Sequence, residues 1–249
     1  MDSAGSVILL YGDHRMCHFR SWRTEPPAGY TYPASDSHDM TDTNDLNGQY
    51  SNPSGEPGRE VLSAMNEHHQ PLWDFCLSHM PKGMDGSVLD IGCGGGGFLR
   101  RMSERYPYAM FFGVDISGDS LEMTAETNQS LVDEGGLELH EASVDSMPFV
   151  DGSFDLVTAM ETYFFWPDLD KAIGEISRVT SVGGILVIGS EMRVETGDED
   201  YIRESLDNYG ARLVRDSEMV GIMESHGFDV TVYTKPENRW VVFVGSKRI

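Results

Sequence analysis

Apolar and polar positions divide the chain into an irregular beginning and a patterned remainder. Residues 1–58 are rich in Asp, Ser, Thr, Asn, Gly and Pro and have little periodic apolar character, which predicts an irregular acidic N-terminal arm. Apolar residues then recur at helical spacing through residues 59–81, where Pro71 interrupts them. We therefore expect two short helices that meet near Gln70 and form a lid.

Strand-like and helix-like runs alternate from residue 87 to the end of the chain, which is typical of a parallel sheet covered by helices on both faces. The expected strands are Ser87–Ile91, Met110–Asp115, Leu137–Glu141, Phe154–Met160, Ile185–Ser190, Phe228–Thr234 and Arg239–Gly245. The expected helices are Gly97–Arg105, Ser117–Asp133, Asp168–Val179 and Asp216–His226.

Only residues 235–238 separate the last two strands, which is too short for a parallel crossover and predicts an antiparallel hairpin. The expected fold of residues 87–249 is therefore a Rossmann-like α/β core. Its sheet is doubly wound, mostly parallel and seven-stranded, and ends in that hairpin.

Charge and cysteine content limit the partners and the location. The chain has 18 Lys and Arg against 41 Asp and Glu, a formal net charge of -23, which disfavours nucleic acid and anionic membrane surfaces. Three cysteines without paired spacing supply neither a disulfide framework nor a zinc site. The apolar run at residues 7–11 is too short to span a bilayer. We expect a cytoplasmic protein, a monomer or homodimer, that is not bound to a membrane.

A glycine-rich turn at residues 92–97 follows the first strand and opens a helix. Glycines at such a turn let a ligand approach the backbone where a side chain would clash. Gly92, Gly94 and Gly97 fit the pattern G-x-G-x-x-G, and Asp115 follows at the spacing of a ribose-binding acid. These features alone would indicate NAD.

Asp90, two residues before the first glycine, favours a different cofactor. A carboxylate a few ångströms from a phosphate is repelled by roughly 1 kcal/mol in water and by several in a partly buried site. S-adenosylmethionine presents an amino group and a sulfonium instead, and both are attracted to the acid. The sequence therefore favours S-adenosylmethionine over NAD.

Four segments in this order resemble the class I S-adenosylmethionine-dependent methyltransferases, in particular small-molecule enzymes with a domain like that of ubiquinone and menaquinone methyltransferases. The resemblance covers about residues 58–245. It rests on residues 89–96 (LDIGCGGG), 113–117 (GVDIS), 146–157 (SMPF followed by GSFDLV) and 175–184 (EISRV followed by GG).

The resemblance implies which residues bind the cofactor. It assigns Asp90, Gly92 and Gly94 to the methionine end, Asp115 to both ribose hydroxyls and Ile116 to one face of the adenine. A carboxylate is able to accept two hydrogen bonds from a vicinal diol, in agreement with the role of Asp115.

The resemblance also implies the adenine contacts and a substrate-facing segment. Ser143 and Val144 stand at the two positions that contact the adenine in the family. The family usually has Asp at the position of Ser143, where it contacts the adenine amine. Asp145 is a possible substitute for that Asp. Met160 opens the segment 160–167, which in the family touches the methionine portion of the cofactor and the substrate. The His-His pair often found there is absent from this chain.

Methyl transfer from a sulfonium is an in-line displacement that relies mainly on alignment, so a base is needed only when the acceptor must lose a proton. Glu161 is the first candidate base, His69 the second, and Tyr163 a candidate orienting hydroxyl. The aromatic residues 164–166 could stack on a planar acceptor or face a cation. The scattered His and Cys residues give no metal constellation.

The sequence thus predicts methyl transfer from S-adenosylmethionine to a small molecule, aromatic or amine-bearing. Two alternatives stay open: an NAD-dependent oxidoreductase and a non-catalytic module that binds S-adenosylmethionine.

Overall fold

Two consecutive helices precede the sheet in the computed structural model, which describes residues 48–249. Residues 1–47, most of the predicted arm, lie outside the described residues. Helix α2 (Gly55–His68) begins within the segment that the sequence predicts to be irregular, and residues 48–51 also form a helical turn. Helix α3 (Gln70–Ser78) follows directly, with Pro71 in its first turn, where a missing N–H costs nothing. The predicted break near Gln70 is confirmed.

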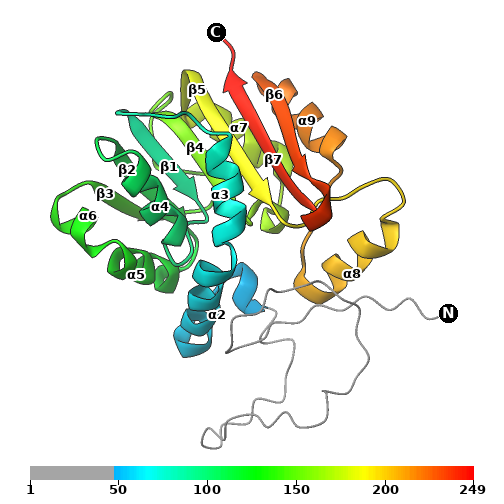
Figure 1. The fold of residues 1–249 in the computed structure, drawn as a ribbon, viewed down its shortest axis with the longest axis horizontal. Coiled ribbons are helices and arrows are strands. Elements are labelled where there is room, and N and C mark those ends of the chain that lie inside the picture. The colour runs from blue at the N-terminus through cyan, green and yellow to red at the C-terminus, as the bar shows by residue number, and fades with distance from the viewer. Residues whose placement is uncertain (1–47) are drawn as a thin grey trace, which may run out of the picture. The chain divides into compact units, whose positions relative to one another are not determined.

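The sheet contains seven strands in the order β3-β2-β1-β4-β5-β7-β6 (Figure 1). Its first five strands are parallel, and β7 runs antiparallel to both β5 and β6, so the predicted doubly wound sheet with a C-terminal hairpin is confirmed. The strands are β1 (Ser87–Ile91), β2 (Met110–Asp115), β3 (Leu137–Glu141), β4 (Phe154–Met160), β5 (Thr180–Ser190), β6 (Phe228–Lys235) and β7 (Trp240–Lys247).

Helices cover both faces of this sheet. Helices α3, α4 and α5 lie over one face, and α7 and α9 lie over the other (Figure 1). A separate cluster of buried apolar side chains fills the space on each side. The remaining helices are α4 (Gly97–Arg105), α5 (Gly118–Thr127), α6 (Gln129–Asp133), α7 (Leu169–Val179), α8 (Glu199–Tyr209) and α9 (Asp216–Ser225), with short 3-10 turns η1 (Tyr163–Phe165) and η2 (Pro236–Asn238).

Two helical features differ from the sequence expectation. The helix expected over 117–133 is divided at Asn128, whose side-chain amide donates to the carbonyl groups of Gly96 and Thr124. This residue therefore ends α5 and at the same time fastens the glycine turn. Helix α8 was not expected, because five of its eleven residues are charged and the few apolar ones are scattered among them.

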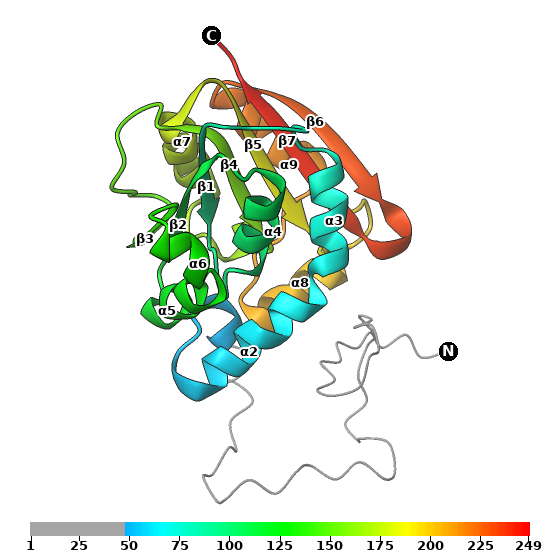
Figure 2. The same cartoon turned by 60° about the vertical axis from the view of Figure 1, so that its left-hand side comes forward.

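The strand order places a ligand site. Strand β1 lies between β2 and β4, so the chain winds away from β1 in opposite directions on its two sides. In open α/β sheets, ligands bind at the carboxyl ends of the strands at such a switch point. Helices α2 and α8 both lie at this end of the sheet (Figure 2).

Among the described residues, no helix combines the length and the apolar character needed to cross a bilayer.

Candidate cofactor and acceptor site

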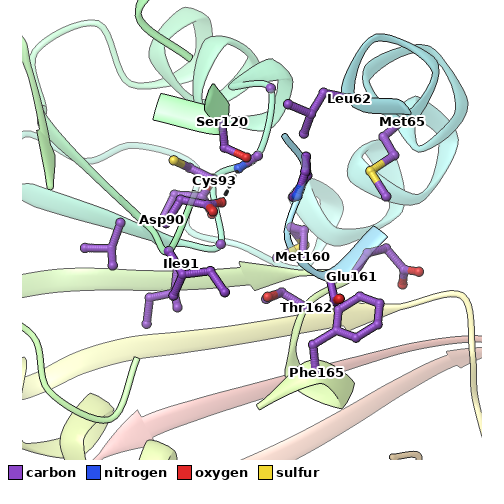
Figure 3. A pocket seen from close by; sticks show the side chains of 18 of the residues that line it. Leu62, Met65, Asp90, Ile91, Cys93, Ser120, Met160, Glu161, Thr162 and Phe165 are labelled. Carbon is purple, nitrogen blue, oxygen red and sulfur yellow. Dashed lines mark hydrogen bonds between the residues drawn. The ribbon is translucent and has the colours of Figure 1, made fainter. Parts of the chain in front are cut away.

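A cavity of about 350 Å³ opens at the carboxyl ends of β1, β2 and β4. Its walls come from the glycine turn, from α2 and from the segment that follows β4. Figure 3 shows Leu62 and Met65 of α2 facing Asp90 across the cavity, with Phe165 closing a further side. All eight residues predicted to bind the cofactor line it: Asp90, Gly92, Gly94, Asp115, Ile116, Ser143, Val144 and Met160.

The glycine turn needs its glycines for conformation and for space. Gly92, Gly94 and Gly96 have φ values of 66°, 53° and 75°, in the left-handed region that residues with a Cβ avoid. A Cβ on Gly92 would lie 2.9 Å from the Cβ of Thr162 and would clash with its hydroxyl. The turn therefore keeps open a narrow strip of backbone that faces the cavity.

Asn66 of α2 holds the other end of the turn. Its Nδ2 donates to the Gly95 carbonyl at 2.9 Å, and its Oδ1 accepts from the Gly97 amide at 3.1 Å. The side-chain amide of Asn66 thus binds one backbone carbonyl and one backbone N–H of the turn at the same time, and these two hydrogen bonds fix the turn relative to α2. Helix α2 is thus part of the cofactor cavity and is joined to it by hydrogen bonds.

Asp90 is a buried carboxyl at the bottom of the cavity, only 2% exposed. Within the described chain its hydrogen bond comes from the Thr158 hydroxyl, which donates to Oδ1 at 2.7 Å. Burial raises the pKa of Asp90 to about 7, although the Thr158 hydroxyl acts in the opposite direction. A buried carboxylate beside an open space favours a cationic ligand, because a cation restores the solvation that burial removed.

Asp115 ends β2 and organises two neighbouring backbone amides. Its Oδ2 accepts from the Gly94 amide and its Oδ1 accepts from the Ser117 amide, each at 2.9 Å. Burial raises its pKa, and these two amides oppose that shift. Each oxygen keeps one further lone pair, so the group remains able to accept two hydrogen bonds from a vicinal diol.

The wall next to Asp115 is apolar. Ile116 is 52% exposed although it is a large aliphatic residue, and it lies at the cavity beside Ser143 and Val144. An exposed isoleucine at a cavity offers a flat contact for a ring. Asp145, a possible substitute for the usual family acid, does not line the cavity, and its carboxylate binds Lys171 at 2.8 Å.

Glu161 follows β4 with a strained backbone at φ 56°, which is rare for a residue with a side chain. Such strain is common at functional sites, where it fixes the direction of a side chain. The carboxyl of Glu161 accepts a hydrogen bond from the Glu191 amide, and Figure 3 shows it turned away from Asp90. Burial, together with the neighbouring Glu191 carboxylate, raises its pKa well above the ordinary value.

His69 also lines the cavity and belongs to a polar group, here called the His-Glu cluster, formed by His68, His69 and Glu191. Oε2 of Glu191 lies 3.1 Å from Nε2 of His68 and 3.6 Å from Nδ1 of His69. Burial by itself would raise the pKa of Glu191, but the two imidazoles outweigh it and lower the pKa. The sequence analysis found no metal-ligand group, whereas the fold brings these three residues together.

Tyr163 does not take the place that the sequence assigned to it. It is 3% exposed, packs in the cluster of apolar side chains beneath α7 and does not line the cavity. Burial raises the pKa of its hydroxyl. Of the aromatic run 164–166, Phe164 is buried in the same cluster, and Phe165 and Trp166 reach the cavity.

Several residues of the site carried no motif in the sequence. Thr158 and Asn66 are joined to Asp90 and to the glycine turn only by the fold. Glu191 follows a strand end at the carboxyl edge, the one sequence signal that could have marked it. Tyr50, Ser51, Asn52 and Pro53, within the predicted arm, also line the cavity.

Comparison with known proteins agrees with this site. Residues 89–188 match a family described as a methyltransferase domain. The chain is 29% identical over 125 residues to the sarcosine/dimethylglycine N-methyltransferase of Halorhodospira halochloris, covering 50% of this chain and 44% of that protein. It is 33% identical over 117 residues to the demethylmenaquinone methyltransferase of Thermus thermophilus, covering 46% of this chain and 50% of that protein. The chain thus spans about half the length of these curated relatives.

A solved structure shows the same fold. The geranyl diphosphate C-methyltransferase of Streptomyces coelicolor A3(2), in complex with Mg²⁺, geranyl diphosphate and S-adenosyl-L-homocysteine, has a TM-score of 0.65 and 14% identity. The likeness covers 83% of this chain and 98% of that one. At 14% identity, this likeness shows that the two chains share a fold and nothing more about function. Residues 89–188 therefore form a methyltransferase domain, and the sequence relatives support a classification with the class I S-adenosylmethionine-dependent methyltransferases and S-adenosylmethionine as the cofactor.

Proposed function

We propose that the protein transfers a methyl group from S-adenosylmethionine to a small amine-bearing or aromatic acceptor. One observation supports this most: a single cavity contains the carboxyls Asp90 and Asp115 at one end and His69 and Glu161 at the other. S-adenosylmethionine supplies an electrophilic methyl carbon on a sulfonium. The two carboxyls Asp90 and Asp115 would bind the amino group and the ribose of the cofactor. His69 and Glu161 would then face the acceptor.

The residues around the glycine turn would hold the cofactor by charge and shape. Asp90 would pair with the amino group, and the absence of side chains at Gly92 and Gly94 would let the methionine end approach the backbone. Asp115 would accept from both ribose hydroxyls, and Ile116 would pack on the adenine. Ser143 and Val144 would border the ring, with Ser143 as the polar contact.

The helices at residues 59–81 would form the cover of the acceptor. Leu62, Met65 and Trp73 line the cavity from α2 and α3, opposite the strand ends. The two hydrogen bonds of the Asn66 side chain join this cover to the glycine turn. The surface proposed for the acceptor is therefore held in a fixed position relative to the surface proposed for the cofactor. Met160 and Phe165 border the same space from the segment after β4.

The choice of acceptor follows from the lining and from the relatives. The mixed wall of Leu62, Met65, Phe165 and Trp166 fits an apolar or planar body, and the carboxyls fit an amine. One relative is named for sarcosine and dimethylglycine, which are amines, and another for demethylmenaquinone, which is aromatic. The negative chain also favours neutral or cationic acceptors over anionic ones.

Proton handling at the acceptor end favours His69 over Glu161. Burial and the neighbouring Glu191 carboxylate raise the pKa of Glu161, which favours its neutral form, and its carboxyl already accepts from the Glu191 amide. The Nδ1 atom of His69 is buried and has no hydrogen-bond partner within residues 48–249. The His69 ring lines the cavity, so it is placed to orient an acceptor. Tyr163, enclosed in the apolar cluster, is left with a packing role.

Two measurements test the proposed function. Calorimetry with S-adenosylhomocysteine and with NAD should show binding of the first and none of the second. Incubation with S-adenosylmethionine labelled in its methyl group should then move the label to a member of a panel of small amines and phenols. Binding of NAD alone would point to an oxidoreductase. Binding of S-adenosylhomocysteine with no transfer across the panel would favour a non-catalytic binding module.

The raised pKa of Asp90 predicts a pH dependence of cofactor binding. Below pH 7 the ligand-free carboxyl carries a proton, which a cationic ligand must displace, so affinity rises with pH and levels off above about 7. We expect S-adenosylhomocysteine, which keeps its amino charge over this range, to bind about tenfold more weakly at pH 6 than at pH 8. Calorimetry across this range measures the change.

Two variants show whether Asp90 causes this dependence. Asp90→Asn should bind weakly at every pH and lose the slope. Thr158→Val removes the hydroxyl that opposes the shift, so the slope should persist with its midpoint at higher pH. A wild-type affinity that stays flat from pH 6 to 8 would contradict the assignment of Asp90.

A further inference from the structure

We propose that the His-Glu cluster is a binding site for a divalent first-row transition metal ion at the acceptor end of the cavity. The inference deepens the proposed function and rests on it only for the role of the ion, because ion binding is measured without methyl transfer. The ligands would be Nε2 of His68, Nδ1 of His69 and Oε2 of Glu191. Of the three residues only His69 lines the cavity, so an acceptor with an oxygen or nitrogen lone pair would reach the ion from the side of His69.

The distances fit three ligands of one ion. Ligand atoms bonded at about 2.0–2.2 Å to a tetrahedral or octahedral metal are roughly 3.0–3.6 Å from their neighbours. Oε2 of Glu191 lies 3.1 Å from Nε2 of His68 and 3.6 Å from Nδ1 of His69. All three ligand atoms lie within 4.8 Å of one another, so a small closure of the two imidazoles completes the set.

The helix break explains why two successive histidines converge. In a continuous helix, neighbouring residues point in directions that do not face each other. Here α2 ends at His68 and α3 begins at Gln70, so His69 lies between the helices. The two rings are 5.0 Å apart and inclined at 65°, and both approach the residue that follows β5.

The hydrogen bonding of the three side chains favours a bound metal ion over an ion pair between histidine and glutamate alone. Nδ1 of His69 is buried without a hydrogen-bond partner in the described chain, and 3.6 Å to Glu191 is too long for a hydrogen bond. A buried nitrogen left in this way is costly unless something binds it. A metal ion would bond to this lone pair and would also neutralise the carboxylate.

The donor set selects the class of ion. Two imidazoles and one carboxylate with open positions are typical of catalytic zinc and of non-haem iron, while Mg²⁺ and Ca²⁺ prefer oxygen ligands throughout. Glu161 lies beside the site and accepts from the Glu191 amide, so it holds one ligand residue in position without being a ligand itself.

Metal binding to the full chain tests the proposal. The protein is stripped with a chelator and dialysed, then titrated with Zn²⁺ in a calorimeter and with Co²⁺ in a spectrophotometer. We expect binding of one ion that is lost or weakened by at least about tenfold in His69→Ala and in Glu191→Gln. The Co²⁺ absorption bands should change in the same variants.

A matched control separates the cluster from other histidines and from the acidic surface. His226→Gln removes an imidazole that lies 3.0 Å from the Asp170 carboxylate, a His-carboxylate pair without a third ligand. It should leave Zn²⁺ affinity unchanged. Unaltered circular dichroism and S-adenosylhomocysteine affinity in the two cluster variants exclude unfolding as the cause of a loss.

The result that overturns the proposal is equal Zn²⁺ affinity in the wild type, His69→Ala and Glu191→Gln. Histidines 14, 18 and 38 or surface carboxylates would then account for any binding seen. This failure differs from failure of the proposed function. Methyl transfer that persists in the chelated protein without metal binding would leave the methyltransferase proposal intact.

Discussion

Gly92→Ala will reduce the affinity for S-adenosylhomocysteine by about 100-fold, because the new methyl group occupies space the turn needs. A Cβ at this position would lie 2.9 Å from the Cβ of Thr162 and closer still to its hydroxyl. Either Thr162 or the turn must move, and a displacement of about 1 Å in a binding surface can cost two orders of magnitude. Calorimetry on the purified variant measures the loss.

The control for this prediction is Gly135→Ala. Gly135 has φ 70°, close to the 66° of Gly92, but a Cβ there meets nothing within 4 Å. Both variants therefore carry the same left-handed backbone strain of about 1–2 kcal/mol, and only Gly92→Ala adds the clash at the cavity. We expect Gly135→Ala to keep the wild-type affinity, and Gly92→Ala to lose affinity and, through the added clash, to melt at a lower temperature than Gly135→Ala. Equal affinities would mean that the turn does not contact the cofactor.

Asp115→Asn is expected to weaken binding of S-adenosylhomocysteine by at least about 100-fold. Each hydrogen bond to a charged group contributes about 1.5–3 kcal/mol; Asn keeps only one acceptor oxygen, so the ribose diol would lose one bond outright and the other would no longer be charge-assisted. The substitution also leaves one amide without an acceptor, since the Gly94 and Ser117 amides now bind one oxygen each. Affinity from calorimetry and melting temperature together distinguish loss of the ligand contact from loss of the turn.

Asp155→Asn is the matched comparison for Asp115. Its carboxylate also accepts from a backbone amide, that of Ser87 at 3.0 Å, and from the Ser181 hydroxyl at 3.2 Å, but it does not line the cavity. This variant should lose some stability and keep its affinity. If Asp115→Asn bound the ligand as tightly as Asp155→Asn does, the assignment of Asp115 to the ribose would be wrong.

The positions of the strands along the chain followed from local patterns. Four of the seven strands, β1 to β4, have the bounds that alternation and turn residues predicted, because each is a short apolar run between polar loops. The hairpin of β6 and β7 followed from a four-residue connection that permits no other arrangement. Helix α8 was missed because its apolar residues are few and only Ser205 of the helix is buried, so no buried apolar stripe marks it in the sequence.

The cofactor end of the site was also predictable. Its residues lie in or next to turns at strand ends, where a parallel sheet gathers ligand-binding groups whatever the rest of the fold. Tyr163 was assigned to the site from proximity in sequence to Glu161, and a 3-10 turn directs it into the apolar core instead. Proximity along the chain does not give the direction of a side chain.

The sequence by itself determined the strands, the glycine turn and the two carboxyls that line the cavity beside it, because each depends on residues within one strand-turn-helix unit. Only the tertiary structure decided the acceptor end. Strands β1 to β5 separate His69 from Glu191 along the chain, and the two residues meet because α3 packs on β5. Contacts between distant segments arise from packing of the complete core, which no local pattern records.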